Sequence, residues 1–396
     1  MGLALVFTGG GARAAYQVGV LRCLARRLPD VQIEIITGVS AGAINAIFLA
    51  SRSAPLRDVV EELTDVWKSL TLSDVIRIDS LALIRDLFRR NKNAAEMHGL
   101  VDTTPLRRLL ERLYPENADG EIAGVAANVA RCQPKAVAVT TLDYTTGQTV
   151  TWVSGCEIET WERPLRRSVL SKLTLDHVLA SAALPFVFPA VRLGRHWHGD
   201  GGIRLAAPFS PALHLGATRM LAVSSHYEKS FSEADEPQII GYPPPAQILG
   251  QLVNAVFLDV IDEDSGRLER SNAFLRELPL EHRHGYRIVD FAVIRPSQDI
   301  GRLAAEFEPR LPRSFRFVTR TLGTRETSEA DFMSLFMFVP EYLQRLIALG
   351  EADAEAQIDA IVRVAQEPLG DPAGPAPGET AVSRGKYRRT KKNQAK

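Results

Sequence analysis

Near the start of the chain, two short apolar segments are each followed by a glycine turn and then by a helical pattern. Residues 2–7 and 33–36 are apolar runs of strand length, and helical patterns cover about 12–28 and about 41–51. A strand–turn–helix order that occurs twice is typical of a parallel sheet covered by helices on both faces. We therefore expect an α/β protein, a three-layer sandwich with a mostly parallel central sheet.

The rest of the chain continues this pattern and then becomes mainly helical. The expected further strands are 135–142, 149–153, 220–224 and 287–294, with a hairpin turn at 144–147. The expected further helices are 56–70, 80–90, 104–114 and 174–183. From about residue 244 the pattern is mostly helical, with a long amphipathic stretch at 298–364. We expect one domain over residues 1–365.

The composition changes near Pro368. Residues 366–396 are expected to form a disordered Pro/Gly linker followed by a basic tail, and residues 384–396 contain no acidic side chain. The tail is either a solvated end or a peripheral contact with anionic lipid, to which each basic residue contributes up to about 1 kcal/mol.

Composition limits the partners and the compartment. Lys plus Arg equals Asp plus Glu at 47 each, so nucleic acid is not an expected partner. Cys23, Cys132 and Cys156 show neither a metal-binding pattern nor a disulfide framework, which suits a reducing compartment. The first apolar run is too short for a signal peptide, and no stretch approaches the roughly 20 residues of a membrane span. We expect a soluble cytoplasmic protein without a metal.

Ser40 lies in a Gly-x-Ser-x-Gly sequence, GVSAG at 38–42. The expected strand ends at Ile36 and the expected helix begins near Ala41, which places Ser40 on a tight strand-to-helix turn. Such a turn exposes a nucleophilic serine and leaves no room for side chains beside it. Ser40 is the candidate nucleophile; the alternative is a structural turn with an unreactive serine.

Three consecutive glycines, Gly9, Gly10 and Gly11, follow the first expected strand. In a right-handed βαβ unit this loop and the Ser40 turn meet at the same edge of the sheet, where glycine N–H groups could stabilise an oxyanion. The spacing also fits a dinucleotide-binding loop. That alternative needs an acidic residue at the end of the second strand, but Glu34 lies within the strand and the serine turn occupies its end.

Asp200 lies between glycines in the sequence HGDGG at 198–202. In isolation this is an ordinary turn. Together, GGGARA at 9–14, GVSAG and DGG resemble, in sequence and in order, the signature of the patatin-like phospholipase family. Segments 180–189, 208–217, 295–301 and 321–332 also look like bacterial members, so the resemblance extends over about 1–365.

The resemblance implies a lipid acyl hydrolase with a Ser40–Asp200 dyad, an acyl-enzyme intermediate and no cofactor. It implies an oxyanion hole formed by Gly9, Gly10 and Gly11. The supporting positions that it suggests are Arg13, Gly38, Gly42, Gly201 and Gly202. Arg13 either contacts the substrate or braces the loop.

Two features bear on this interpretation. Ala14 replaces the glycine usual in the family, which matters only if that position is left-handed. Histidine candidates for a conventional triad are His177, His196, His198, His214 and His226. Only His214 and His226 follow Asp200 in the usual chain order, and neither lies in a recognisable motif. If alternating residues of a strand share a face, His196 and His198 both lie near Asp200 as supporting side chains. A catalytically silent lipid-binding or scaffolding protein is the remaining alternative.

Overall fold

The computed structural model describes residues 2–77, 101–230, 260–312 and 331–366, together with residues 233, 235, 248, 251 and 315. The helix predicted at 80–90 and the linker and basic tail after residue 366 lie outside the described residues. No helix in the described part of the chain combines the length and the apolar composition that crossing a bilayer requires.

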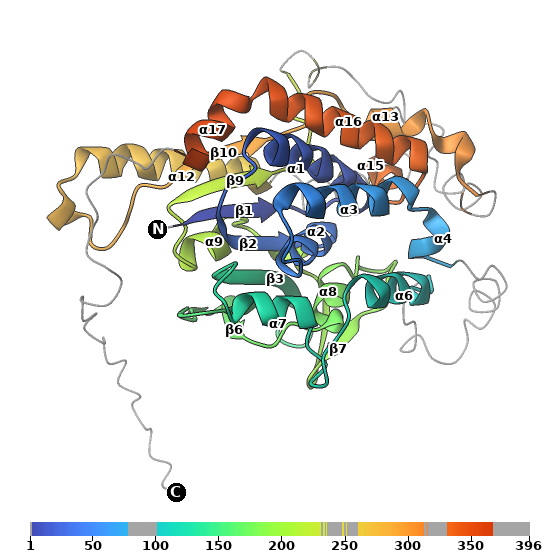
Figure 1. Ribbon diagram of the computed structural model, residues 1–396, viewed down its shortest axis with the longest axis horizontal. Coiled ribbons are helices and arrows are strands. Elements are labelled where there is room, and N and C mark those ends of the chain that lie inside the picture. The colour runs from blue at the N-terminus through green and yellow to red at the C-terminus, as the bar shows by residue number, and fades with distance from the viewer. Residues whose placement is uncertain are drawn as a thin grey trace, which may run out of the picture.

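A ten-stranded sheet forms the middle layer of the molecule (Figure 1). Its five parallel strands lie in the order β10-β9-β1-β2-β3. They are β1 (Leu3–Phe7), β2 (Ile33–Val39), β3 (Ala136–Asp143), β9 (Arg219–Val223) and β10 (Asp290–Ile294). These runs are apolar on both faces because helices cover both faces of the sheet. The predicted mostly parallel sheet is confirmed.

The other half of the sheet is mixed. β4 (Gln148–Gly155) pairs antiparallel with β3 through the predicted turn, and β6 (Arg166–Leu170) pairs with β4 and with β5 (Glu162–Arg163). β8 (His196–Asp200) pairs antiparallel with β7 (Val191–Leu193) and with the end of β3. This last pairing brings Asp200 to the edge where β2 ends.

Helices form the two outer layers. On one face α1 (Ala15–Arg27), α3 (Leu56–Ser69) and α16 (Pro340–Ala356) lie side by side, with α2 (Ala41–Ala50) beneath them (Figure 1). The other face packs against α9 (Ser210–His214) and α12 (Val260–Glu277). Alternate residues of β1 serve the two cores: Leu5 and Phe7 belong to the first, and Ala4 and Val6 to the second. The three-layer prediction is confirmed.

Shorter helices complete the described part. A 3-10 turn, η1 (Gly11–Ala14), precedes α1, and η3 (Gly201–Arg204) follows β8. The remaining helices before α9 are α4 (Leu72–Val75), α6 (Thr104–Leu113), α7 (Ala123–Val129) and α8 (Leu175–Ser181).

The C-terminal part is mainly helical, as predicted, but residues 298–364 do not form one long stretch. The described pieces are α13 (Ile300–Ala305), η5 (Glu308–Arg310), α15 (Asp331–Ser334), α16 and α17 (Ile358–Gln366). Pro340 stands at the start of α16, after an extended Val339. Proline lacks an N–H and disfavours a helical conformation in the residue before it. A helix therefore cannot run through Val339 and Pro340, although the apolar periodicity of the sequence continues across them.

Two glycines allow α1 and α16 to pack closely. A Cβ atom on Gly19 would lie 2.0 Å from the Ile347 carbonyl oxygen, and one on Gly350 would lie 2.1 Å from the Tyr16 carbonyl oxygen. Each helix therefore contributes a glycine against the backbone of the other.

Gly350→Ala is expected to lower the free energy of unfolding by about 1–3 kcal/mol, because the methyl group overpacks this contact. Denaturant unfolding measures the change. Gly266→Ala on α12 is the control, since its Cβ would meet only the end of the Arg270 side chain at 3.4 Å. Equal stability of the two variants would contradict close packing of α1 on α16.

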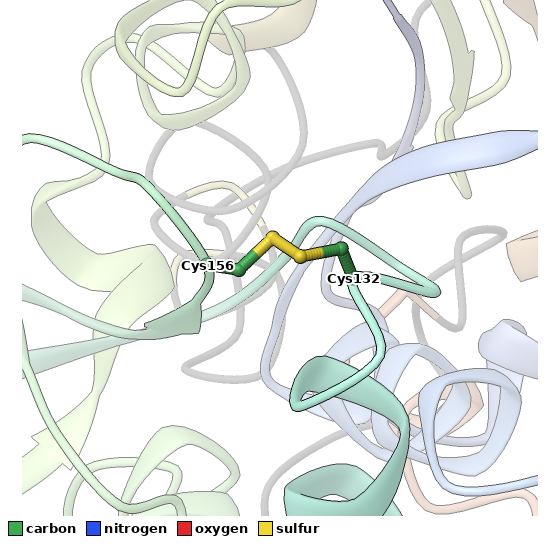
Figure 2. The surroundings of a disulfide bond; sticks show 2 residues. All are labelled: Cys132 and Cys156. Carbon is green, nitrogen blue, oxygen red and sulfur yellow. A yellow bond between two sulfur atoms is a disulfide. The ribbon is translucent and has the colours of Figure 1, made fainter.

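The expectation that the cysteines form no disulfide is wrong. Cys132, in the loop after α7, is bonded to Cys156 at the end of β4, with 5.7 Å between the Cα atoms (Figure 2). The two residues are 24 apart in sequence, and only the folded loop brings them within bonding distance. Cys23 is free and buried. The inference of a reducing compartment from the cysteine pattern therefore loses its support.

Candidate active site

Ser40 joins the end of β2 to the start of α2. Its backbone has φ 57° and ψ −133°, a conformation that non-glycine residues rarely adopt. The Ser40 N–H donates to Ser181 Oγ at 2.9 Å, and the Ser181 hydroxyl donates to the Thr140 carbonyl at 2.7 Å. Ser181 on α8 thus holds the strained turn from outside. Ser40 is 8% exposed and lies in the wall of a cavity.

The glycines on either side of Ser40 have no room for a Cβ atom. A Cβ on Gly38 would lie 2.5 Å from the Gly42 carbonyl oxygen, and one on Gly42 would lie 2.4 Å from the Thr8 carbonyl oxygen. The first contact lets β2 turn sharply into α2. The second lets α2 approach the end of β1, which carries the glycine loop.

Asp200 is the last residue of β8 and is fully buried. Its Oδ1 accepts a hydrogen bond from the Gly202 N–H at 2.8 Å, while its Oδ2 is buried with no hydrogen-bond partner in the described ranges. Burial raises the pKa of the carboxyl group to about 7, opposed by the Ser40 hydroxyl and the Gly202 N–H. Gly201 lets this turn lie against β3, because a Cβ there would be 2.3 Å from the Thr140 carbonyl oxygen.

The glycine loop lies directly beside Ser40. A Cβ built on Gly9 would be 3.0 Å from Ser40 Cβ, and Gly10 and Gly11 line the same cavity as Ser40. Gly10 and Gly11 have φ of 150° and 55°, which favour glycine. Among the described residues, no hydrogen-bond acceptor is bound to the N–H groups of Gly9, Gly10 and Gly11.

The basic residue of the loop faces inward. Arg13 is 2% exposed and its Nε donates to Ser334 Oγ at 2.6 Å, so it ties the loop to α15. This contact favours bracing over a contact with substrate. Ala14 has φ −65°, in the right-handed region, so alanine is compatible with the position where the family usually has glycine.

The histidines make other contacts. His196 and His198 do share a face of β8, where His196 Nδ1 binds Asp143 Oδ2 at 2.7 Å and His198 Nδ1 binds Thr141 Oγ1 at 3.1 Å. His177 caps α8, His214 stacks on Trp161, and His226 lies 4.0 Å from Asp262. In the part of the chain that the structure describes, no histidine is hydrogen-bonded to Ser40 or Asp200. The Ser40 hydroxyl instead acts on the Asp200 carboxyl group, whose pKa it lowers against the effect of burial.

A cavity opens onto Ser40. Its walls come from α2, α3, α6 and the segment 335–338, and they are almost entirely apolar. They include Phe48, Leu63, Val66, Trp67, Leu110 and Phe336. Such a cavity fits a hydrocarbon chain rather than a polar ligand. Within the described ranges, no group of three or more His, Cys, Asp or Glu side chains is arranged to hold a metal ion.

The glycine loop, the serine turn and the aspartate turn lie at one edge of the sheet. A family model described as patatin-like phospholipase matches residues 5–213, more than half of the chain. The chain belongs to the patatin-like phospholipase family. Because the chain belongs to this family, we discard the alternative that it is a dinucleotide-binding protein. The wider resemblance, beyond residue 213, stays a prediction.

Relatives of this patatin-like protein include known phospholipases. Calcium-independent phospholipase A2-gamma of Rattus norvegicus is 27% identical over 53% of this chain and 25% of the relative, and that of Mus musculus is 26% identical over the same shares. The chain thus spans about a quarter of these relatives' length. Among solved structures, VipD from Legionella pneumophila is 14% identical with a TM-score of 0.37, over 91% of this chain and 67% of that chain.

Proposed function

We propose that this patatin-like protein is a serine acyl hydrolase that cleaves fatty-acyl esters of phospholipids or related lipids. The observation that carries the proposal is the convergence of three parts at one sheet edge: a strained serine, a buried aspartate and an apolar cavity. The related phospholipases and the family support a lipid substrate. The cavity supports a substrate with a long acyl chain.

The proposed reaction is a two-step acyl transfer. Asp200 accepts the Ser40 hydroxyl proton as Oγ attacks the ester carbonyl carbon, and the N–H groups of Gly9, Gly10 and Gly11 stabilise the oxyanion. The bond to the leaving alcohol breaks, and Asp200 returns the proton to that oxygen. Water, deprotonated by Asp200, then attacks the acyl-enzyme; the bond to Ser40 Oγ breaks, Asp200 returns the proton to Oγ, and the fatty acid is released. Asp200 suits this role because a carboxyl group with a pKa near 7 is a stronger base than an exposed one.

Labelling with a fluorophosphonate probe tests the proposal. We expect the probe to modify Ser40 in the wild type, with no labelling and no hydrolysis of p-nitrophenyl esters in Ser40→Ala. The peptide carrying the label identifies the serine directly. A well-folded wild type that neither reacts with the probe nor hydrolyses esters, yet binds lipid, would instead fit the silent lipid-binding alternative.

Val66→Phe is expected to shift the substrate preference toward short acyl chains, because the added ring fills part of the cavity next to α3. Each methylene kept out of an apolar site loses about 0.8 kcal/mol of burial. Excluding two methylenes therefore lowers kcat/KM for p-nitrophenyl palmitate about tenfold relative to the butyrate ester.

Val362→Phe on α17, a partly buried position that does not line the cavity, is the control for the same change in size. The two variants are compared as ratios of kcat/KM for the long and short esters. Equal ratios in Val66→Phe and the wild type would show that the acyl chain binds elsewhere.

A further inference from the structure

The carbonyl groups of Thr8, Gly9 and Gly10 each accept a hydrogen bond, two of them from residues outside the glycine loop. Gln17 Nε2 donates to the Thr8 carbonyl at 2.8 Å, Ser225 Oγ donates to the Gly9 carbonyl at 2.6 Å, and the Arg13 N–H donates to the Gly10 carbonyl at 3.0 Å. In a planar trans peptide the carbonyl and the following N–H point in opposite directions. Fixing a carbonyl therefore fixes the N–H of the next residue. The three bonds set the directions of the Gly9, Gly10 and Gly11 N–H groups.

The hydrogen bond from Gln17 is the last in a series of side-chain hydrogen bonds that begins at Trp67. Trp67 Nε1 donates to Asn45 Oδ1 at 2.9 Å, and Asn45 Nδ2 donates to Gln17 Oε1 at 2.9 Å. Asn45 Nδ2 also donates to the Ala14 carbonyl at 3.2 Å. An indole nitrogen can only donate and a backbone carbonyl can only accept, so both amides have one possible orientation. Gln17 must present its NH₂ group to Thr8.

This series of hydrogen bonds is buried and links three helices to the residue after β1. Gln17 on α1 and Asn45 on α2 are both fully buried, and Trp67 on α3 is 4% exposed. Trp67 also lines the apolar cavity beside Ser40. A buried network of this kind is rigid when every member is satisfied. It runs from the cavity wall to the peptide that carries the Gly9 N–H.

We propose that Gln17 is a positioning residue for acyl transfer: it holds the Thr8 carbonyl so that the Gly9 N–H points at the oxyanion, and Asn45 and Trp67 fix the orientation of its amide. This inference rests on the proposed hydrolase function and adds to it a residue that touches neither substrate nor Ser40. Without Gln17, the Thr8 carbonyl loses its hydrogen-bond donor, and the Gly9 N–H is held less firmly in the direction that the oxyanion needs. The loss of Gln17 therefore raises the free energy of the transition state, in which the oxyanion exists, and leaves substrate binding unchanged.

The test compares Gln17→Met with the wild type. Methionine has a similar length and no donor, so we expect kcat to fall about tenfold to a hundredfold, less than the 10²–10³ that follows complete loss of an oxyanion donor. KM for p-nitrophenyl butyrate stays within about twofold, because ground-state binding does not use the oxyanion contact. Affinity for a trifluoromethyl ketone, which forms a tetrahedral adduct with the serine, falls by the same factor as kcat.

Asn272→Leu is the matched control. Asn272 is also a buried amide that holds a backbone carbonyl, donating to that of Val289 at 2.8 Å, but it lies on α12 against the other face of the sheet. We expect it to lose comparable stability in denaturant unfolding and to keep the wild-type kcat. If both variants lose activity only in proportion to their unfolded fraction, Gln17 is structural and the proposal fails.

A second variant tests whether the hydrogen bonds from Trp67 through Asn45 orient Gln17. Asn45→Leu removes the partner that orients the Gln17 amide, so it is expected to lower kcat, and the double variant Gln17→Met/Asn45→Leu to lower it no further than Gln17→Met alone. If the losses in kcat of the two single variants add in the double variant, Asn45 does not act through Gln17 and the proposed series of hydrogen bonds is wrong. A wild type without esterase activity would refute the hydrolase function, whereas an active wild type with a fully active, folded Gln17→Met would refute only the role of Gln17.

Discussion

Replacing Asp200 with asparagine is expected to lower kcat by about 10²–10⁴-fold, the usual contribution of a general base, while raising stability above pH 7. The carboxyl group is fully buried, its Oδ2 has no partner among the described residues, and its pKa is raised from 3.8 to about 7. Asparagine keeps the acceptor for the Gly202 N–H but cannot take the Ser40 proton. The activity assay and denaturant unfolding measure the two effects on one variant.

The sign of the stability effect follows from the direction of the pKa shift. Between about pH 4 and pH 7 the folded protein holds a proton on Asp200 that the unfolded chain releases, so this group's contribution to stability falls as pH rises through that window. Above pH 7 the folded state contains a buried charge. Removing it is expected to stabilise the protein by about 1–3 kcal/mol at pH 8.5, less than the full shift would give because the new amide NH₂ lacks a strong acceptor.

The same ionisation is expected in the pH profile of the wild type. Because the base form of Asp200 is the active one, kcat/KM rises with pH and levels off above an apparent pKa of about 7. Two results would contradict this role of Asp200: full activity in Asp200→Asn, or a plateau that begins at pH 4.

The position of the site could be predicted because it depends on topology and local sequence. The carboxyl ends of parallel strands meet at one edge of a sheet, so strands ending at Phe7 and Val39 bring the glycine loop to Ser40. Asp200 was found only through the resemblance of three motifs in order. Its own strand, β8, is five residues long and too polar to be recognised alone.

The residues that support the site could not be predicted, because they come from distant parts of the chain. Ser181 reaches the Ser40 N–H across 141 residues, and Ser225 reaches the Gly9 carbonyl across 216. Gln17 and Asn45 are buried amides within apolar helical patterns, and such polar residues in the interior of a helix were the one local signal that was available. The Cys132–Cys156 bond was missed for the same reason, since spacing alone does not show which loops meet.

Gly42→Ala is expected to lower kcat about a hundredfold in a protein that still folds. The new Cβ would lie 2.4 Å from the Thr8 carbonyl oxygen and 2.7 Å from that of Phe7, and these backbone atoms cannot swing aside as a side chain would. Gln17 holds the Thr8 carbonyl at 2.8 Å, so the end of β1 and α2 must separate as rigid pieces. Ser40, two residues before Gly42, then moves away from Gly9, and displacements near 1 Å can cost about 10²-fold in rate.

Gly124→Ala separates this effect from a general loss of stability. Its Cβ would lie 2.1 Å from the Ser51 carbonyl oxygen, which is the same kind of backbone clash at the opposite end of α2. We expect both variants to be destabilised in thermal unfolding, and only Gly42→Ala to lose kcat after correction for the folded fraction. If both lose activity equally, α2 transmits the displacement along its length, and the contact between Gly42 and Thr8 has no separate part in aligning Ser40 with the glycine loop.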